Sequence, residues 1–237
     1  MTVIDKLRGR LIVSCQALPQ EPLHGPIFMA AMAKAAALGG AGGIRANGEA
    51  DIAAIRAVVT LPILGIRKRK VAGTEIYITP EFIDAQAVVR AGADLVALDG
   101  TIRPRSQSEP SLPNLIARIH DELRVPVMAD CSCVADAEAA AAAGADLLAT
   151  TLSGYTDHGR PPCEGPDLDL IDALVERFSL PVIAEGRFYR PEQVAEAFDR
   201  GAFAVVVGGA ITRPHEITCR FVEAIPASRV RDADRSP

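Results

Sequence analysis

Residues 90–100 read RAGADLVALDG, and residues 142–152 repeat nearly the same pattern as AAGADLLATTL. In each copy an alanine-containing stretch ends at a glycine, and an apolar run follows at once. Glycine is the common residue just after a helix, so each copy predicts a helix end followed by a strand. Weaker copies, LGGAGGIRANG at 38–48 and DRGAFAVVVGG at 199–209, extend the repeat along the chain.

A second series of apolar runs begins with proline at the strand entry: LPILGI at 61–66, VPVMAD at 125–130 and LPVIAE at 180–185. Proline is tolerated there because no hydrogen bond inside the strand is lost. The two series interleave, so the repeating unit is strand–helix–strand–helix, used about four times. Four such units predict an α/β protein with a closed (β/α)8 TIM barrel, and 237 residues suit that fold.

The predicted strands are continuous apolar runs, which is typical of parallel strands covered on both faces. They are expected at 10–16, 41–46, 61–66, 93–100, 125–131, 145–151, 180–186 and 203–209. The helices are expected at 26–40, 80–92, 111–123, 134–144, 167–178 and 190–201. An open doubly wound sheet is the alternative, but its glycine-rich turn is missing after the first strand. We expect one barrel domain at 1–225 and a polar, frayed tail at 226–237.

Composition limits the possible partners. The net charge is −5, and the one basic run, Arg67 to Lys70, has no aromatic platform beside it, so we expect no nucleic acid. No segment approaches the roughly 20 apolar residues of a membrane span, and no targeting signal is evident, so a cytoplasmic protein is expected. The five cysteines are read as reduced thiols, and no zinc-binding pattern appears, so we expect no metal.

Polar residues close almost every predicted strand. In a TIM barrel the C-terminal strand ends meet at one face and form the active site, so these residues are expected to converge on one pocket. They are Gln16, Arg45, Lys68, Asp99, Asp130, Thr150 or Thr151, Glu185, and the glycines at 208 and 209.

Lys68 and Glu185 are the candidates for acid/base chemistry, because they close strands on opposite sides of the barrel. A lysine buried near other cations binds its proton less tightly and can act as a base. By strand alternation Arg67 and Arg69 are expected to point away from Lys68. The alternatives are a solvated charge for Lys68 and an ion pair with Arg45 or Arg187 for Glu185.

Two aspartates remain ambiguous at this stage. Asp130 is read either as a hydrogen-bond partner of a substrate hydroxyl or as a helix N-cap, for which Ser132 is better placed. Asp99 precedes glycine, so it is read equally as a turn residue.

A phosphate is expected at the last two strands. Barrels often bind phosphate with the loops after strands 7 and 8 and a helix N-terminus. Here AEGR at 184–187 and VGGAITRP at 207–214 occupy those places. Gly208 and Gly209 allow the backbone to approach an anion closely, and a helix is expected to begin near Ile211 or Thr212. The Arg213 guanidinium can donate two hydrogen bonds to the same anion. The alternative is a plain glycine turn.

From the residues alone, we expect an enzyme that moves a proton next to a carbonyl on a small phosphorylated substrate. No nucleophile–base pair, metal motif or dinucleotide fingerprint is evident, which favours an isomerase or epimerase without a cofactor. The alternatives are a non-catalytic sugar-phosphate-binding barrel and another phosphate-binding barrel, such as a pentose-phosphate epimerase.

Several motifs together resemble the N-acylglucosamine-6-phosphate 2-epimerases. They are LIVSCQ (11–16), GIRKR (65–69), DLVALDGTIRPR (94–105), DCS (130–132), ATTLSGYT (149–156), VIAEGR (182–187) and VGGAITRP (207–214). The resemblance covers nearly the whole chain, and ATTLSGYT with VIAEGR is quite specific. It differs from the family pattern at Asn47, Lys70, Cys133 and the segment 157–167, which bears on the preference for the N-acyl group.

The resemblance implies interconversion of N-acetylmannosamine 6-phosphate and N-acetylglucosamine 6-phosphate, in sialic acid catabolism, by a cytoplasmic homodimer that needs no cofactor or metal. It implies that Lys68 removes the C2 proton and that Glu185 assists the proton's return. It also implies substrate-binding positions at the sugar, the acetamido group and the phosphate. These positions are Gln16, Arg45, Asp130, Ser153, Gly186, Arg187, Gly208, Gly209 and Arg213.

Overall fold

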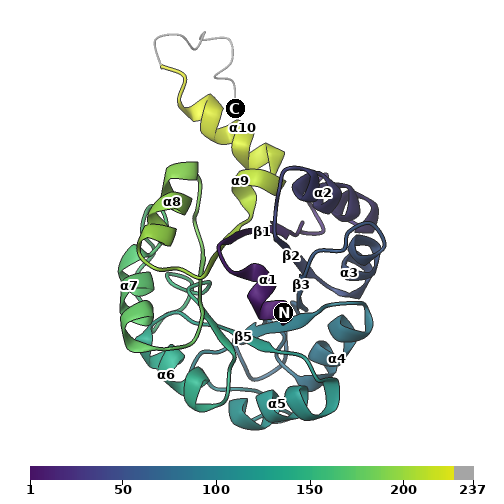
Figure 1. The fold of residues 1–237 in the computed structure, drawn as a ribbon, viewed down its shortest axis with the longest axis vertical. Coiled ribbons are helices and arrows are strands. Elements are labelled where there is room, and N and C mark those ends of the chain that lie inside the picture. The colour runs from purple at the N-terminus through teal and green to yellow at the C-terminus, as the bar shows by residue number, and fades with distance from the viewer. Residues whose placement is uncertain (227–237) are drawn as a thin grey trace.

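Eight parallel strands follow one another around a closed barrel, and β1 pairs with β8 to complete the ring (Figure 1). The computed structural model describes residues 1–226, so the predicted frayed tail lies almost wholly outside the described residues. The TIM-barrel prediction is confirmed, and the open-sheet alternative is excluded. The strands are β1 (Arg10–Cys15), β2 (Gly43–Asn47), β3 (Ile63–Ile66), β4 (Leu95–Asp99), β5 (Val127–Asp130), β6 (Leu147–Ala149), β7 (Val182–Glu185) and β8 (Ala204–Val207).

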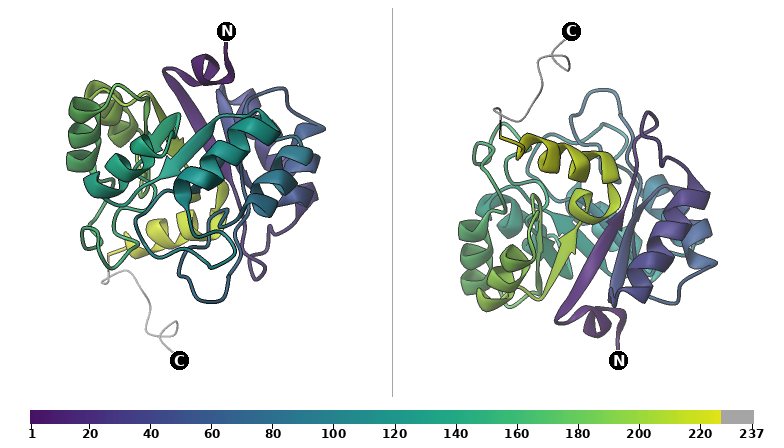
Figure 2. Two further views of the ribbon diagram at one scale, coloured as in Figure 1. Left: turned by 90° about the horizontal axis from the view of Figure 1, so that it is seen from below. Right: turned by 90° about the horizontal axis from the view of Figure 1, so that it is seen from above.

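Helices cover the outside of the strands, as Figure 2 shows from two sides. All six predicted helices are present, and the third ends in a π-helical turn, η1 (Ile119–Leu123). They are α2 (Pro26–Leu38), α4 (Phe82–Arg90), α5 (Leu112–Arg118), α6 (Val134–Ala142), α7 (Leu168–Arg177) and α8 (Pro191–Asp199). The helix expected near Ile211 begins two residues earlier, as α9 (Gly209–Thr212).

Three further helices were not predicted: α1 (Val3–Leu7), α3 (Glu49–Arg56) and α10 (Pro214–Glu223). Helix α1 has only five residues, and it is held by a reciprocal cap between Thr2 and Asp5. Its Leu7 is fully buried among the side chains that fill the barrel interior, so α1 plugs the N-terminal end of the barrel. Helices as short as α1 and α3 are set by tertiary packing more than by their own sequence pattern.

The aspartate of each strong repeat has a structural role. The Asp94 carboxylate accepts a hydrogen bond from the Ile63 amide at 2.8 Å, at the entry of the preceding strand β3. Asp146 does the same for the Val127 amide of β5, also at 2.8 Å. Each aspartate thus clasps the N-terminal ends of two neighbouring strands, and each clasped amide directly follows a proline. These hydrogen bonds therefore link strands of the first sequence series to strands of the proline series at the N-terminal end of the barrel.

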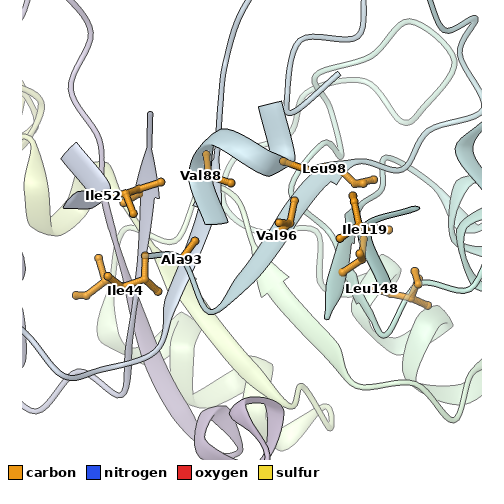
Figure 3. Packing of buried hydrophobic residues seen from close by; sticks show 14 of the residues in the cluster. Ile44, Ile52, Val88, Ala93, Val96, Leu98, Ile119 and Leu148 are labelled. Carbon is orange, nitrogen blue, oxygen red and sulfur yellow. The ribbon is translucent and has the colours of Figure 1, made fainter. Parts of the chain in front are cut away.

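Apolar residues fill two layers. One layer lies inside the barrel and includes Ile12, Leu95 and Leu147, all fully buried. The other lies between strands and helices, where Figure 3 shows Ile44 and Val96 of the strands against side chains of α3, α4 and η1. Burial of this kind stabilises the fold by about 25 cal/mol per Å² of apolar surface. None of the helices among residues 1–226 has the length and apolar character needed to cross a membrane.

Candidate active site

A pocket of about 370 Å³ opens at the C-terminal ends of the strands. Its size suits a ligand of drug or sugar-phosphate dimensions. Most of the predicted site residues line it, so most strand ends converge as expected, but Asp99, Asp130 and Ser153 do not line it. Those that line it are Gln16, Arg45, Lys68, Glu185, Gly186, Arg187, Gly208, Gly209 and Arg213.

Arg45 crosses the barrel and joins two carboxylates at the bottom of the pocket. It is 1% exposed, and its two terminal nitrogens donate to Asp130 at 3.0 and 2.5 Å. One of them also donates to Glu185 Oε2 at 2.5 Å. Thr151 Oγ1 completes the cluster by donating to Asp130 Oδ1 at 2.7 Å, with Glu185 Oε2 at 3.2 Å. Asp130 therefore holds Arg45 rather than facing the pocket, and Glu185 pairs with Arg45, not with Arg187.

Lys68 is the one member of the basic run that lines the pocket. Arg67 and Arg69 turn the other way and pair with the fully buried Asp84 of α4, at 3.5 and 2.6 Å. The alternation argument is thus confirmed. Asn47 fixes the Lys68 backbone by accepting its amide hydrogen at 2.8 Å. Residues 67–79 then fold back on themselves, with an antiparallel bridge between Lys68 and Ile78.

The electrostatic surroundings change the proton affinities of both candidate acid/base groups. Desolvation by the surrounding protein and the nearby Arg45 guanidinium lower the pKa of Lys68 to about 8, although solvent still reaches its side chain through the pocket. The cations responsible are Arg45 and, to a smaller extent, Arg213, and not the sequence neighbours of Lys68. Burial raises the pKa of Glu185, while Arg45 opposes this rise. A lysine that loses its proton readily and a carboxyl that keeps it longer are suited to proton transfer near neutral pH.

The β8 end of the pocket has the features expected of an anion site. Gly208 and Gly209 line it, and α9 begins there, so the first amides of that helix have no partner within the helix. The Arg213 guanidinium lies beside them and pairs with Glu216 at 2.7 Å and Glu21 at 3.3 Å. A side-chain carbon added at Gly209 would lie 2.2 Å from Glu216 Oε2, so this carboxylate packs directly against the glycine.

Arg187 organises the loop after β6. Its guanidinium donates to the Ser153 and Gly165 carbonyls at 2.6 and 2.7 Å and to Cys163 Sγ at 3.5 Å. The structure does not bring the Ser153 side chain into the pocket, because its buried hydroxyl donates to Asp167 at 2.5 Å. Arg187 reaches the pocket wall while most of its donors hold this loop.

Two polar clusters lie away from the pocket. Asp99 is fully buried and accepts hydrogen bonds from Thr101 and Arg103, so it holds its own loop. Cys133, Asp136 and His158 come within 4.8 Å of one another, a spacing that could hold a metal ion. However, Asp136 already accepts hydrogen bonds from Ile102, Ser132 and His158. This cluster fastens the segment 157–167 to the start of α6, where Cys133, not Ser132, is the N-cap residue.

Of the two threonines expected at the end of β6, Thr151 lines the pocket and Thr150 does not. Two contributors to the site escaped the sequence analysis. Asn47 was noted only as a departure from a family pattern, and Tyr77 was not noted at all, yet Tyr77 lines the pocket. The only sequence signal for Tyr77 is its place in the segment after the basic run, which shows neither helical nor strand periodicity. All five cysteines are free, as expected.

Fold and site together define a class: a TIM-barrel enzyme with a lysine and a carboxyl group in its pocket, suited to proton transfer. Residues 29–227 match the model of a family described as "Putative N-acetylmannosamine-6-phosphate epimerase". The chain belongs to this family.

Individual relatives agree with this assignment. A protein from Caldanaerobacter subterraneus subsp. tengcongensis named "Putative N-acetylmannosamine-6-phosphate 2-epimerase" is 48% identical over 97% of this chain and 96% of its own. One of the same name from Cutibacterium acnes is 50% identical over 94% and 96%.

One solved structure supports the family, and another supports the fold only. The N-acetylmannosamine-6-phosphate 2-epimerase from Clostridium perfringens superposes with a TM-score of 0.91 at 43% identity, over 94% of this chain and 96% of that one. Thiamine phosphate pyrophosphorylase from Pyrococcus furiosus, at 17% identity and a TM-score of 0.58, shares the fold alone.

Proposed function

We propose that this protein interconverts N-acetylmannosamine 6-phosphate and N-acetylglucosamine 6-phosphate by moving the proton at C2. The observation that carries this proposal is the pairing of Lys68 and Glu185 in one pocket, from strands on opposite sides of the barrel. Inversion at carbon requires a proton to leave one face and to return to the other. Groups facing each other across the ligand are suited to that task.

In this mechanism Lys68 is the base. Its lowered pKa leaves a useful fraction of neutral amine near neutral pH, and neutral amine is the form that can accept the C2 proton. Arg45 contributes by keeping a positive charge near Lys68, and its own proton is secured by Asp130 and Glu185. The buried carboxylates thus hold Arg45 in place while Lys68 titrates.

Glu185 is the acid on the opposite face. Its raised pKa favours the protonated form that can deliver a proton to C2, and Thr151 and Arg45 fix its Oε2 atom. In the reverse direction the two groups exchange roles, as microscopic reversibility requires.

The phosphate is proposed to bind at Gly208, Gly209 and Arg213, and Gln16, which lines the same pocket, is proposed to contact the sugar or its acetamido group. Backbone amides at a helix start and a guanidinium fork both favour an anion. The phosphate anchors one end of the substrate, so C2 is held between Lys68 and Glu185. Positioning of this kind supplies a large part of the rate enhancement in enzymes.

The alternative of a non-catalytic sugar-phosphate-binding barrel predicts binding without turnover. A metal-dependent pentose-phosphate epimerase needs histidines at the strand ends, and no histidine lines the pocket within residues 1–226. We therefore favour the amino-sugar phosphate reaction.

The test is to incubate the protein with N-acetylmannosamine 6-phosphate in D2O and to follow the C2 proton by NMR. We expect the N-acetylglucosamine 6-phosphate epimer to form with deuterium at C2. Unphosphorylated N-acetylmannosamine is the matched control and should react far more slowly. A bound ligand that shows neither epimer nor exchange would support the binding-only alternative instead.

We also propose that the protein acts as a homodimer. Helix α10 extends away from the ring of helices (Figure 1), and none of its residues is buried in the single chain. Phe221 and Val222 are 75% and 57% exposed. A second copy of the chain would cover this apolar surface. Sedimentation analysis should give a dimer that dissociates in a Phe221→Asp variant. A monomeric wild-type protein would contradict this proposal.

A further inference from the structure

Tyr77 lies in the segment that folds back beside Lys68. Its backbone carbonyl accepts the Arg69 amide hydrogen at 3.0 Å, and its neighbour Ile78 forms the antiparallel bridge with Lys68. Two residues further on, the Thr79 hydroxyl donates to the Ala97 carbonyl of β4 at 2.7 Å. The backbone on both sides of Tyr77 is therefore fixed to the barrel, which places Tyr77 next to Lys68.

The hydroxyl group of Tyr77 is free to meet a ligand. The half-buried ring packs against the apolar layer inside the barrel and lines the pocket together with Arg45, Lys68 and Glu185. Among residues 1–226, no hydrogen-bond partner of the hydroxyl is found. Burial and the carboxylates of Asp130 and Asp99 raise the pKa of Tyr77, so the phenol stays protonated and remains a donor where Lys68 loses its proton.

The other polar side chains at the pocket floor already have partners. Arg45 is engaged by Asp130 and Glu185, and the Thr151 hydroxyl contacts the same two carboxylates. The proposed reaction, however, needs one more donor. The C2 proton is acidic only when C1 is a carbonyl, and its removal transfers negative charge to the C1 oxygen. A preorganised donor at such an oxygen is a major source of catalysis in enzymes.

We propose that Tyr77 Oη donates a hydrogen bond to the C1 oxygen of the open-chain substrate and stabilises the charge that develops there. The C2–H bond breaks and its proton passes to Lys68 Nζ. The electron pair forms the C1–C2 double bond, and the carbonyl π electrons move to the C1 oxygen. When a proton returns to C2 these shifts reverse, and Tyr77 keeps its own proton throughout. This inference rests on the proposed function and adds the oxyanion partner to it.

The test compares Tyr77→Phe with Tyr189→Phe. Tyr189 lies at the rim of the same pocket and is 44% exposed, which makes its variant a matched control. We expect Tyr77→Phe to lower kcat by about 10²- to 10³-fold, the usual effect of losing one oxyanion donor. KM should change by less than about threefold, and deuterium exchange at C2 should fall in parallel with epimerisation. The control should keep its activity, and both variants should keep the wild-type Tm.

Activity of Tyr77→Phe within about threefold of wild type would overturn the proposal. A loss confined to KM, with kcat unchanged, would also overturn it, because it would assign Tyr77 to binding that is equal in the ground and transition states. If the wild-type protein itself formed no epimer, the proposed function would fail before this inference was reached, so the two failures can be distinguished.

Discussion

The two ends of the barrel differ in the side chains that fill them: one end is apolar, and the other holds paired charged residues. At the N-terminal end α1 closes an interior of apolar side chains, and the aspartate clasps join neighbouring strands. At the C-terminal end the strands carry Arg45, Asp130 and Glu185, all withdrawn from bulk water and tied to one another. Buried charges are costly even when they are paired, whereas apolar filling stabilises. The comparison indicates that stability is concentrated at one end of the barrel and chemistry at the other.

The sharpest test of this division is Lys68→Met. We expect kcat/KM to fall by about 10³-fold or more, because the general base is lost. Stability should stay the same or rise. The folded state binds the Lys68 proton less tightly than the unfolded chain does, so Lys68 destabilises the fold at neutral pH, and methionine removes this effect. Enzyme assays and thermal unfolding of the same samples measure both quantities.

Lys70→Met is the matched control, because Lys70 belongs to the same basic run but does not line the pocket. It should keep activity close to that of wild type. An active Lys68→Met variant would remove Lys68 from the mechanism, and a marked loss of stability in that variant would argue against the division between the two ends.

The opposite outcome is expected for Leu147→Ala. Leu147 is fully buried in the layer inside the barrel. Removing its side chain should lower the free energy of unfolding by about 2–5 kcal/mol through lost burial and the cavity left behind. Because Leu147 does not line the pocket, kcat should change by less than about twofold below the melting temperature. Chemical denaturation and kinetics check this prediction, which a large drop in kcat of the folded variant would contradict.

The pH dependence refines the comparison at the active end. Lys68 must be neutral to accept the C2 proton, and its pKa is lowered to about 8. In the direction where Lys68 is the base, Lys68 must be neutral while Glu185 keeps its proton, so kcat/KM should follow a bell-shaped pH profile with one limb centred near pH 8. Initial rates measured from pH 5 to 10 give the midpoint of each limb. A limb centred near the ordinary pKa of a lysine, with none near pH 8, would show that Arg45 and the pocket do not depress the pKa of Lys68.

The smallest expected effect concerns Glu216→Gln. In the structure the Glu216 carboxylate packs against Gly209 and pairs with Arg213, where the phosphate is proposed to bind. Removing its charge should lessen repulsion of the phosphate and lower KM by about two- to fivefold, with kcat unchanged. Glu192→Gln, on the outer helix α8, serves as the control. An increase in KM would mean instead that Glu216 orients Arg213 for binding.

The sequence predicted the positions of the strands better than it predicted which side chains contact one another. Strands and the inward orientation of Lys68 follow from local rules, namely continuous apolar runs and alternation, and the structure confirms both. The partners of Arg45 could not be predicted in the same way. Its link to Asp130 spans 85 residues and depends on one side chain crossing the barrel.

Tyr77 and Ser153 illustrate the same limit. Tyr77 reaches the pocket because a chain reversal returns it beside Lys68, and no periodic pattern announces that reversal. Ser153 lies in a motif typical of the family, yet its hydroxyl turns toward Asp167, a detail that depends on how the loop after β6 folds. Motif membership therefore predicted the neighbourhood of the site and not the direction of each side chain.

The hydrogen bonds of Asp94 and Asp146 have a consequence for folding during synthesis. Asp94 lies 31 positions after the amide it holds, and Asp146 lies 19 positions after its own. Each of these hydrogen bonds can therefore form soon after its aspartate has emerged from the ribosome. At that point β8, which must pair with β1 to close the barrel, has not yet been synthesised. Strand pairs β3–β4 and β5–β6 can be secured during synthesis, in the order in which they emerge, and ring closure is left as the last step.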